Sequence, residues 1–259
     1  MQLQDILFSQ GFGTRRLCSG LIQHGLVYVH GDGSDDSGGD SNSGPNTAPK
    51  LVTDSTLNLV PQGLRFRVDG VEWAYFEKAY VMLHKPAGTE CSQKPSTYPS
   101  IYTLLPAPLR QRPSKSAVQG VQAVGRLDQD TTGLLLLSDD GQFIHRMSAP
   151  KKHVPKVYEV TTKHPVDATQ VDKLLHGVVL DDSPKPVRAA ACVVAGEHLL
   201  HLTLTEGKYH QVKRMLAAAG NRVEGLHRSR VGGLDLQGLA PGQWRWLRAA
   251  DLDLFKPVA

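Results

Sequence analysis

The sequence predicts an α+β protein with a small N-terminal domain, followed by a larger domain built on a mixed, mainly antiparallel sheet with flanking helices. Its 259 residues are enough for two domains. Two short helical patterns and a strand pattern occupy the beginning of the chain, whereas strand patterns dominate after residue 78, with helical segments between them. We place the small domain at residues 1–70, a linker at 71–77 and the larger domain at 78–259.

A polar stretch interrupts the small domain at residues 32–50. It consists mainly of Gly, Ser, Asp and Asn and has almost no apolar side chain. Such a segment cannot bury enough surface to offset the entropy lost on ordering. We therefore expect a flexible insertion here.

The second helical pattern of the small domain begins with basic residues. Thr14 is a suitable N-cap, which places Arg15 and Arg16 in the first turn of the helix. Positive charge is mildly unfavourable at a helix N-terminus. A bound anion would explain the two arginines better than helix stability does, although plain exposure to solvent is the alternative.

Basic residues are concentrated in two parts of the larger domain. The formal net charge of the chain is only +4. One cluster comprises Lys208, Lys213, Arg214, Arg222, Arg228 and Arg230, and the other comprises Lys151, Lys152, Lys156 and Lys163. Two solvated faces would account for these residues, but their concentration indicates a polyanionic partner such as nucleic acid.

Cysteine spacing and hydropathy narrow the class of protein. The 3 cysteines are far apart and form no CxxC pair, which argues against a disulfide framework or a structural zinc site. No apolar run approaches the ~20 residues of a membrane span, and Asp5 interrupts the apolar core that a signal peptide would need. We expect a soluble, cytoplasmic protein.

The segment GRLDQDTTGLLLLSDDG at residues 125–141 allows three interpretations. Its oxygen-bearing residues and its glycine match the offsets of an EF-hand calcium loop, namely Asp128, Asp130, Thr132, Gly133 and Asp139. An EF-hand needs a helix on each side, however, and both flanks have strand patterns, including the leucine run at residues 134–137. A surface turn and a catalytic acid are the other two interpretations.

Four segments in order carry a resemblance to a known family. GRLDQDTTGLLLLSDDG resembles the signature of pseudouridine synthases, in particular the RsuA family that acts on ribosomal RNA. KVYEV at 156–160 and EGKYHQVKRMLAAAGNRVEGLHRSRVGG at 206–233 agree in order and spacing, and TRRLCSGLIQHGLVYVHG at 14–31 is similar to the S4 RNA-binding module of these enzymes. The resemblance covers nearly the whole chain, apart from the polar insertion.

The resemblance implies a reaction and a fold. It implies an S4-like RNA-binding domain followed by a pseudouridine synthase catalytic domain. DDGQFIHRMSAPKKH and GKYHQVKRM resemble most closely the family members that modify small-subunit (16S) rRNA. The reaction breaks the bond from ribose C1′ to N1 of uracil and rejoins the base through C5, so no cofactor and no metal are implied.

The resemblance also implies roles for individual residues. Asp128 corresponds to the catalytic carboxylate at ribose C1′, and Lys213 to the cation that keeps this carboxylate ionised. Tyr158 corresponds to the tyrosine that stacks on the target uracil and is a candidate for proton transfer at C5. Arg126 corresponds to the arginine that occupies the space left by the flipped uridine. Asp130 and Thr132 are interpreted as residues that shape the turn.

Several basic side chains are expected to contact RNA phosphates. They are Arg15, Arg16, Lys151, Lys152, Lys208, Arg214 and Arg228. The expected partner is ribosomal RNA, in particular small-subunit rRNA in an assembling particle, with no membrane partner and with the protein acting as a monomer. The alternatives are a non-catalytic rRNA-binding or ribosome-assembly protein and a synthase that acts on 23S rRNA.

Overall fold

The computed structural model describes residues 1–30, 48–114, 118–149 and 152–255. The chain divides into two compact units, the first formed by Met1–Ala79 and Pro106–Val121, the second by Tyr80–Leu105 and Gln122–Ala259. Most of the predicted insertion at 32–50 lies outside the described residues. None of the helices in the described ranges has the length and apolar character needed to span a membrane.

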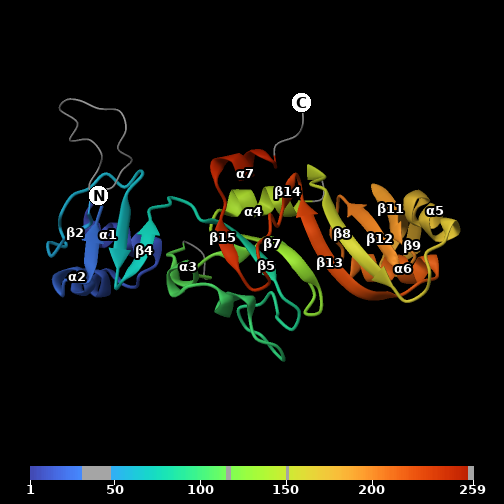
Figure 1. The fold of residues 1–259 in the computed structure, drawn as a ribbon, viewed down its shortest axis with the longest axis horizontal. Helices are drawn as coiled ribbons and strands as arrows, with labels where there is room; N and C mark the ends of the chain where they lie inside the picture. The colour runs from blue at the N-terminus through green and yellow to red at the C-terminus, as the bar shows by residue number, and fades with distance from the viewer. Residues whose placement is uncertain (31–47, 115–117, 150–151, 256–259) are drawn as a thin grey trace. The chain divides into compact units, whose positions relative to one another are not determined.

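The first unit is a small antiparallel sheet with helices (Figure 1). The strand order is β2-β1-β3-β4. Its elements are α1 (Leu3–Gln10), α2 (Arg15–Gln23), β1 (Val27–Val29), β2 (Lys50–Leu51), β3 (Arg65–Val68), β4 (Val71–Ala74) and α3 (Ala107–Gln111). The Thr14 hydroxyl accepts a hydrogen bond from the amide of Leu17 at 3.2 Å, which confirms the predicted N-cap of α2.

The predicted linker at 71–77 is wrong in its first half, because Val71–Ala74 is strand β4. This strand pairs with β3, with Val68 opposite Val71. Asp69 and Gly70 between them have φ values of 49° and 79°, as in the two-residue turns that match the twist of a hairpin. The Asp-Gly pair was the sequence signal for this hairpin.

A segment from the middle of the chain belongs to the first unit, although the sequence prediction ended the small domain at residue 70. The Arg112 side chain is only 2% exposed. Its guanidinium donates to Gln10 Oε1 at 2.9 Å and to the carbonyl of Phe76 at 2.7 Å. These hydrogen bonds connect the segment Pro106–Val121 to α1 and to the end of the N-terminal segment.

The second unit is built on a mixed sheet of nine strands, with the main order β11-β12-β8-β13-β7-β5-β15. Its strands are β5 (Tyr80–Lys85), β6 (Gln122–Ala123), β7 (Thr132–Ser138), β8 (Lys156–Thr162), β11 (Ala191–Gly196), β12 (Leu199–Leu204), β13 (Val223–Val231), β14 (Leu234–Asp235) and β15 (Trp244–Trp246). A separate hairpin joins β9 (Val178–Leu180) to β10 (Ser183–Val187). The helices are η1 (Ile101–Leu104), α4 (Gly141–Ser148), α5 (Ala168–His176), α6 (Gln211–Ala219) and α7 (Ala249–Asp253).

The leucine run at 134–137 forms the buried centre of this sheet, as the sequence predicted. Leu134 and Leu136 share one core cluster with Phe143 of α4 and with Phe255, which follows α7. Figure 1 shows α4 and α7 on the same side of β5 and β7. The mixed α+β architecture agrees with the predicted fold class.

Strand β7 joins the two halves of the sheet through a parallel pairing with β13, in which Arg228 is opposite Gly133. A Cβ atom on Gly133 would lie 2.2 Å from the carbonyl oxygen of Arg228 and 2.6 Å from its amide nitrogen. Gly133 also has a φ of 112°, which L side chains rarely adopt. Only glycine therefore allows the two strands to approach this closely.

We expect Gly133→Ala to destabilise the protein by more than about 2 kcal/mol, because it adds backbone strain and a clash with Arg228. Chemical denaturation followed by circular dichroism measures the difference. Gly141→Ala is the matched control, since a Cβ there meets nothing within 4 Å and its φ is not positive. Equal unfolding free energies for the two variants would contradict the proposed constraint.

Candidate active site

Asp128 lies in a turn between β6 and β7, which are both strands. The flanks therefore exclude an EF-hand, which needs helices on both sides. The amide of Thr131 donates to the Asp128 carbonyl at 3.1 Å and closes the turn. The Asp128 side chain is 27% exposed, and it lines a pocket of about 690 Å³ formed entirely within the second unit.

A buried lysine at the end of β5 supports this turn through hydrogen bonds. Lys85, the last residue of β5, has no exposed surface. Its ammonium donates to the carbonyl of Thr131 at 2.8 Å, of Pro86 at 3.1 Å and of Gln129 at 3.3 Å. Burial lowers the pKa of Lys85, while the charges of neighbouring acidic groups oppose that shift. The lysine thus connects the end of β5 to the turn that carries Asp128.

Lys213 approaches Asp128 from helix α6. One face of this helix is apolar and faces the core, since Val212, Met215, Leu216 and Ala219 are all buried. Lys213 Nζ lies 3.2 Å from Asp128 Oδ2, but it lies closer to Asp130, at 2.7 and 2.8 Å from the two carboxylate oxygens. Burial lowers the pKa of Lys213, but the hydrogen bond to Asp130 and the charges of both aspartates outweigh this and raise it. Asp130 is therefore a direct partner of Lys213 as well as a turn residue.

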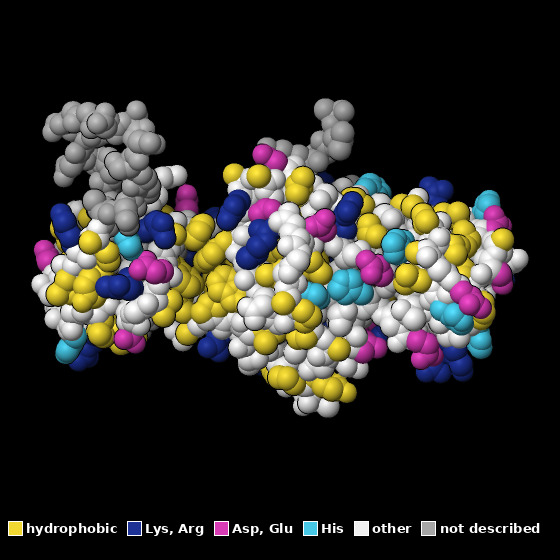
Figure 2. All heavy atoms as spheres, in the orientation of Figure 1, with side chains coloured by type: hydrophobic (Ala, Val, Ile, Leu, Met, Phe, Trp, Pro, Cys, Tyr) yellow, Lys and Arg dark blue, Asp and Glu magenta, His cyan; other side chains and the backbone are white. Residues whose placement is uncertain are grey.

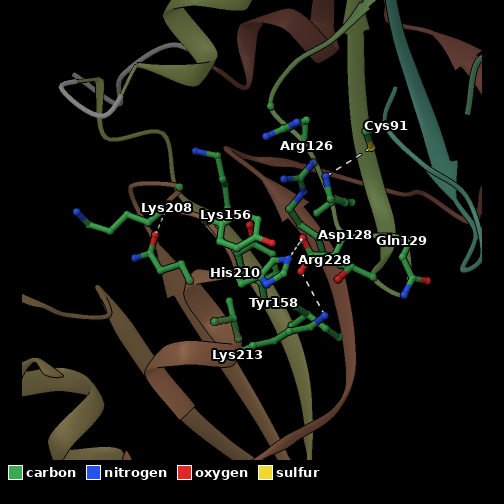
Figure 3. A pocket seen from close by; sticks show the side chains of 18 of the residues that line it. Cys91, Arg126, Asp128, Gln129, Lys156, Tyr158, Lys208, His210, Lys213 and Arg228 are labelled. Atoms are coloured by element: carbon green, nitrogen blue, oxygen red, sulfur yellow. Dashed lines mark hydrogen bonds and ion pairs between the residues drawn. The ribbon is translucent and has the colours of Figure 1, made fainter. Parts of the chain in front are cut away.

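His210 is a second neighbour of Asp128 that the sequence analysis missed. Its Nε2 lies 3.2 Å from Asp128 Oδ1 (Figure 3). His210 precedes α6 and has a φ of 46°, an uncommon conformation for a residue with a side chain. The YHQ sequence before the helix carried no local signal for this geometry. Two cationic or hydrogen-bonding groups thus face the Asp128 carboxylate.

The other two residues of the predicted site also line the pocket. Tyr158 projects from β8 and is 8% exposed, on the same face as the buried Val160 and Thr162. Arg126, just before Asp128, is exposed. Within the described part of the chain, the Arg126 side chain has no hydrogen bond or ion pair. The pocket therefore brings together the Asp128 carboxylate, the Tyr158 phenol and the Arg126 guanidinium, which is available to bind a ligand.

Arg228, one of the predicted phosphate ligands, lines the pocket but is almost fully buried. It is 3% exposed, and its Nε donates to the carbonyl of Leu134 at 2.8 Å. On β13 it is paired with Tyr158 of β8. Lys156, two residues before Tyr158, also lines the pocket. Burial, and then the positive charge of Arg228, lower the pKa of Lys156 from 10.5 to about 8.

Three comparisons with known proteins place this geometry in a family. A model of the RNA pseudouridylate synthase family matches residues 79–218. The chain belongs to this family. It is 41% identical over 68% of its length to the "Ribosomal small subunit pseudouridine synthase A" of Pasteurella multocida (strain Pm70), covering 73% of that protein.

Two further similarities extend over nearly the whole chain. The chain is 34% identical to the "Uncharacterized RNA pseudouridine synthase YtzG" of Bacillus subtilis (strain 168), with 98% of each protein covered. A crystal structure described as that of a pseudouridylate synthase matches with a TM-score of 0.63 and 30% identity, covering 99% of this chain and 100% of that one. The protein is therefore an enzyme of the pseudouridine synthase family.

A loop held by Glu90 forms another wall of the pocket. The Glu90 carboxylate accepts hydrogen bonds from the amides of Ser96 at 3.0 Å and of Thr97 and Tyr98 at 2.9 Å. These hydrogen bonds lower the pKa of Glu90 to about 2. All four residues line the pocket. An ionised Glu90 thus orders this wall at neutral pH.

The remaining basic residues of the predicted RNA-binding set have different environments. Lys208 lines the pocket and Lys152 is exposed, whereas Lys151 lies outside the described residues. Arg214 is bound to the Asp182 carboxylate. On the face of the second unit shown in Figure 2, acidic, basic and histidine side chains are interspersed.

Arg15 and Arg16 begin α2 in the first unit and are both exposed. Arg15 is paired with Asp5 at 2.7 Å, and its guanidinium lies 4.1 Å from the centre of the Phe8 ring. For Arg16, the described residues provide no hydrogen bond or ion pair. Arg16 is therefore the freer of the two predicted phosphate ligands.

We expect Lys85→Met to loosen the turn that carries Asp128, because it removes the ammonium group that donates to the carbonyls of Thr131, Pro86 and Gln129. The unfolding free energy should fall by about 1–3 kcal/mol, and amide hydrogen exchange should accelerate in the peptide that contains Gln129 and Thr131. Lys173→Met on the exposed face of α5 is the control. Unchanged exchange in that peptide would show that Lys85 does not support the turn.

Lys156 should make RNA binding depend on pH, because its ammonium loses a proton as the pH rises through about 8. Affinity for a structured RNA transcript at constant salt should fall over this range in the wild type and not in Lys156→Met. The unfolding free energy should change in the opposite direction, rising between about pH 8 and 10.5, because the unfolded chain then binds more protons. Lys152→Met, at an exposed position, should keep both dependences. The same pH profile for wild type and Lys156→Met would refute this assignment.

Proposed function

We propose that this enzyme converts a specific uridine of small-subunit (16S) ribosomal RNA to pseudouridine without a cofactor, with Asp128 as the catalytic carboxylate. The observation that carries the proposal is the position of Asp128, which lies on a supported turn in a pocket, with Lys213 and His210 each 3.2 Å from its carboxylate. The choice of 16S rRNA is supported by the small-subunit enzymes among its relatives.

The reaction requires few external components. The bond from C1′ to N1 breaks, the uracil turns within the pocket, and a bond forms from C1′ to C5. The proton lost from C5 is balanced by the proton gained at N1, so the product has the same atoms as the substrate. Asp128 acts at the ribose, either by attacking C1′ or by removing a ribose proton, and both roles require an ionised and accurately positioned carboxylate.

Lys213 places positive charge beside the Asp128 carboxylate and shares it with Asp130. A carboxylate in a partly dry pocket tends to bind a proton unless a cation opposes this. Two unit charges about 4 Å apart interact by roughly 4 kcal/mol at an effective dielectric constant of 20, before desolvation is subtracted. Because Lys213 makes its shortest contacts with Asp130, it provides positive charge without fully occupying the oxygens of Asp128.

In this proposal Tyr158 contacts the target base and Arg126 helps to keep the nucleotide flipped. The Tyr158 ring stacks on uracil and its phenol is placed to move the C5 proton, which suits a side chain on a pocket-lining strand. Arg126 is exposed and uncommitted within the described residues, so it can enter the space that the flipped nucleotide leaves. A stacking guanidinium offsets part of the few kcal/mol that flipping costs.

Phosphate binding is assigned to the exposed or pocket-lining lysines and to the first unit. Lys152 and Lys208 contact the backbone near the target, and Arg16 contacts it through an S4-like first unit, with a smaller contribution from Arg15. The partner is small-subunit rRNA in an assembling particle, and the enzyme acts as a monomer. Structured RNA of this kind is recognised by shape and by unpaired nucleotides.

We expect one new pseudouridine in small-subunit rRNA when the purified protein is incubated with transcripts partly assembled with ribosomal proteins. Asp128→Asn should abolish it, because the amide can neither attack C1′ nor accept a ribose proton. Pseudouridine mapping on small- and large-subunit RNA is the measurement. Asp172→Asn, an exposed residue of α5 outside the pocket, is the matched control and should retain activity.

Other outcomes select the alternatives. Modification confined to large-subunit RNA would preserve the enzyme class and refute the 16S assignment. Salt-sensitive RNA binding with no modification of either RNA would favour the non-catalytic assembly role. Full activity of Asp128→Asn would refute the catalytic assignment of Asp128.

A further inference from the structure

An exposed tyrosine at the edge of the pocket has no role in the reaction described above. Tyr209 is 69% exposed, and it lines the pocket. Its ring is stacked on that of His210, with 3.8 Å between the centroids and an angle of 21° between the planes. Within the described residues its hydroxyl has no hydrogen-bond partner. A single exposed ring is common on protein surfaces, but this one lines the pocket and stacks on the histidine that contacts Asp128.

The backbone that carries Tyr209 is held in place from several directions. Arg214 Nη1 donates to the Tyr209 carbonyl at 3.2 Å, and the same guanidinium is bound to Asp182. Gln211 Oε1 accepts from the amide of Lys208 at 2.7 Å, and its Nε2 donates to Glu206 Oε1 at 3.1 Å. Arg214, one of the predicted phosphate ligands, anchors this loop.

This anchoring affects the energetics of binding. Ordering a flexible side chain and its loop on binding costs conformational entropy, so a ring that is already positioned binds at lower cost. Tyrosine also has few side-chain torsions to immobilise. The Tyr209 ring is therefore suited to stack on a flat ligand without rearrangement of the loop.

The stack connects the edge of the pocket to its reactive centre. His210, which lies against the Tyr209 ring, is also 3.2 Å from Asp128. A uridine whose ribose lies at Asp128 has neighbours attached to it by the RNA backbone, which brings one of their bases within reach of the edge. Lys208, adjacent to Tyr209 and also lining the pocket, can pair with an intervening phosphate.

We propose that Tyr209, supported by His210, is a stacking platform for the base of a nucleotide adjacent to the target uridine. This subsite rests on the proposed function, and it adds a contact outside the reacting nucleotide. Stacking on an aromatic ring tolerates any base, because every base has a π-face. The platform therefore contributes affinity and positions the RNA strand without reading its sequence.

The test compares Tyr209→Ala with Tyr209→Phe in steady-state modification of partly assembled small-subunit rRNA. Loss of the ring should raise KM by about 5- to 150-fold, the range expected for one base–aromatic stack, while kcat changes less than about threefold. Tyr209→Phe keeps the ring and should behave like the wild type. Thermal denaturation of both variants checks that the loop and the unit remain folded.

Salt dependence provides an independent measurement. Stacking releases no counterions, so Tyr209→Ala should weaken binding equally at all salt concentrations. Lys208→Ala should instead reduce the slope of log affinity against log salt by about one. Once the target is mapped, an RNA that lacks one neighbouring base should remove the difference between wild type and Tyr209→Ala, as expected for two partners in one contact.

Three results would overturn the platform. The first is an unchanged KM for Tyr209→Ala. The second is a fall in kcat alone, which would mean that Tyr209 only orients His210. The third is a rise in KM for Tyr209→Phe as large as that for Tyr209→Ala. If the wild type binds the RNA but forms no pseudouridine, the proposed function fails, and the dissociation constants of Tyr209→Ala and Tyr209→Phe then decide the platform separately.

Discussion

The close parallel approach of β7 and β13 at Gly133 is the constraint on which the second unit depends. A side chain at this position would overlap the backbone of Arg228, so the two halves of the sheet can meet only around glycine. The approach has a direct consequence for the pocket. Asp128 lies just before β7, Arg228 lies on β13, and Tyr158 is paired with Arg228 on the next strand. The spacing of these groups is thus determined by backbone hydrogen bonds rather than by the side chains themselves.

Three basic residues in and around the pocket differ in their exposure to solvent. Lys85 is fully buried and donates to three carbonyl groups, so it supports the turn. Lys213 is partly exposed and forms ion pairs with both Asp128 and Asp130. Solvent screens such exposed contacts, so each ion pair contributes little to the stability of the fold. Arg126 is exposed and uncommitted within the described residues. The three basic residues therefore have different functions: Lys85 supports the turn, Lys213 adjusts the electrostatics of the carboxylates, and Arg126 is available to contact the substrate.

Much of this arrangement was predictable from short stretches of sequence. The turn at Asp128, the buried leucine strand, the face shared by Tyr158 and Val160, and the inward stripe of α6 all depend on periodicity and turn chemistry within a few residues. The hairpin at Asp69 and Gly70 had an equally local signal, which the linker assignment overlooked. The roles of the aligned catalytic residues came from the family resemblance and remain predictions about chemistry.

By itself, the sequence determined most of the segments that form strands and helices and which carboxylate lies in the turn before the buried strand, because these properties are set by neighbouring residues. Only the tertiary structure decided which cations face solvent and which support the fold. Arg228 is buried because β13 pairs with strands distant in sequence, and Arg214 anchors the Tyr209 loop because Asp182 lies beside it. His210 reaches Asp128 through a left-handed backbone conformation before α6. Long-range pairing and backbone direction have no local periodicity, so composition and spacing could not reveal them.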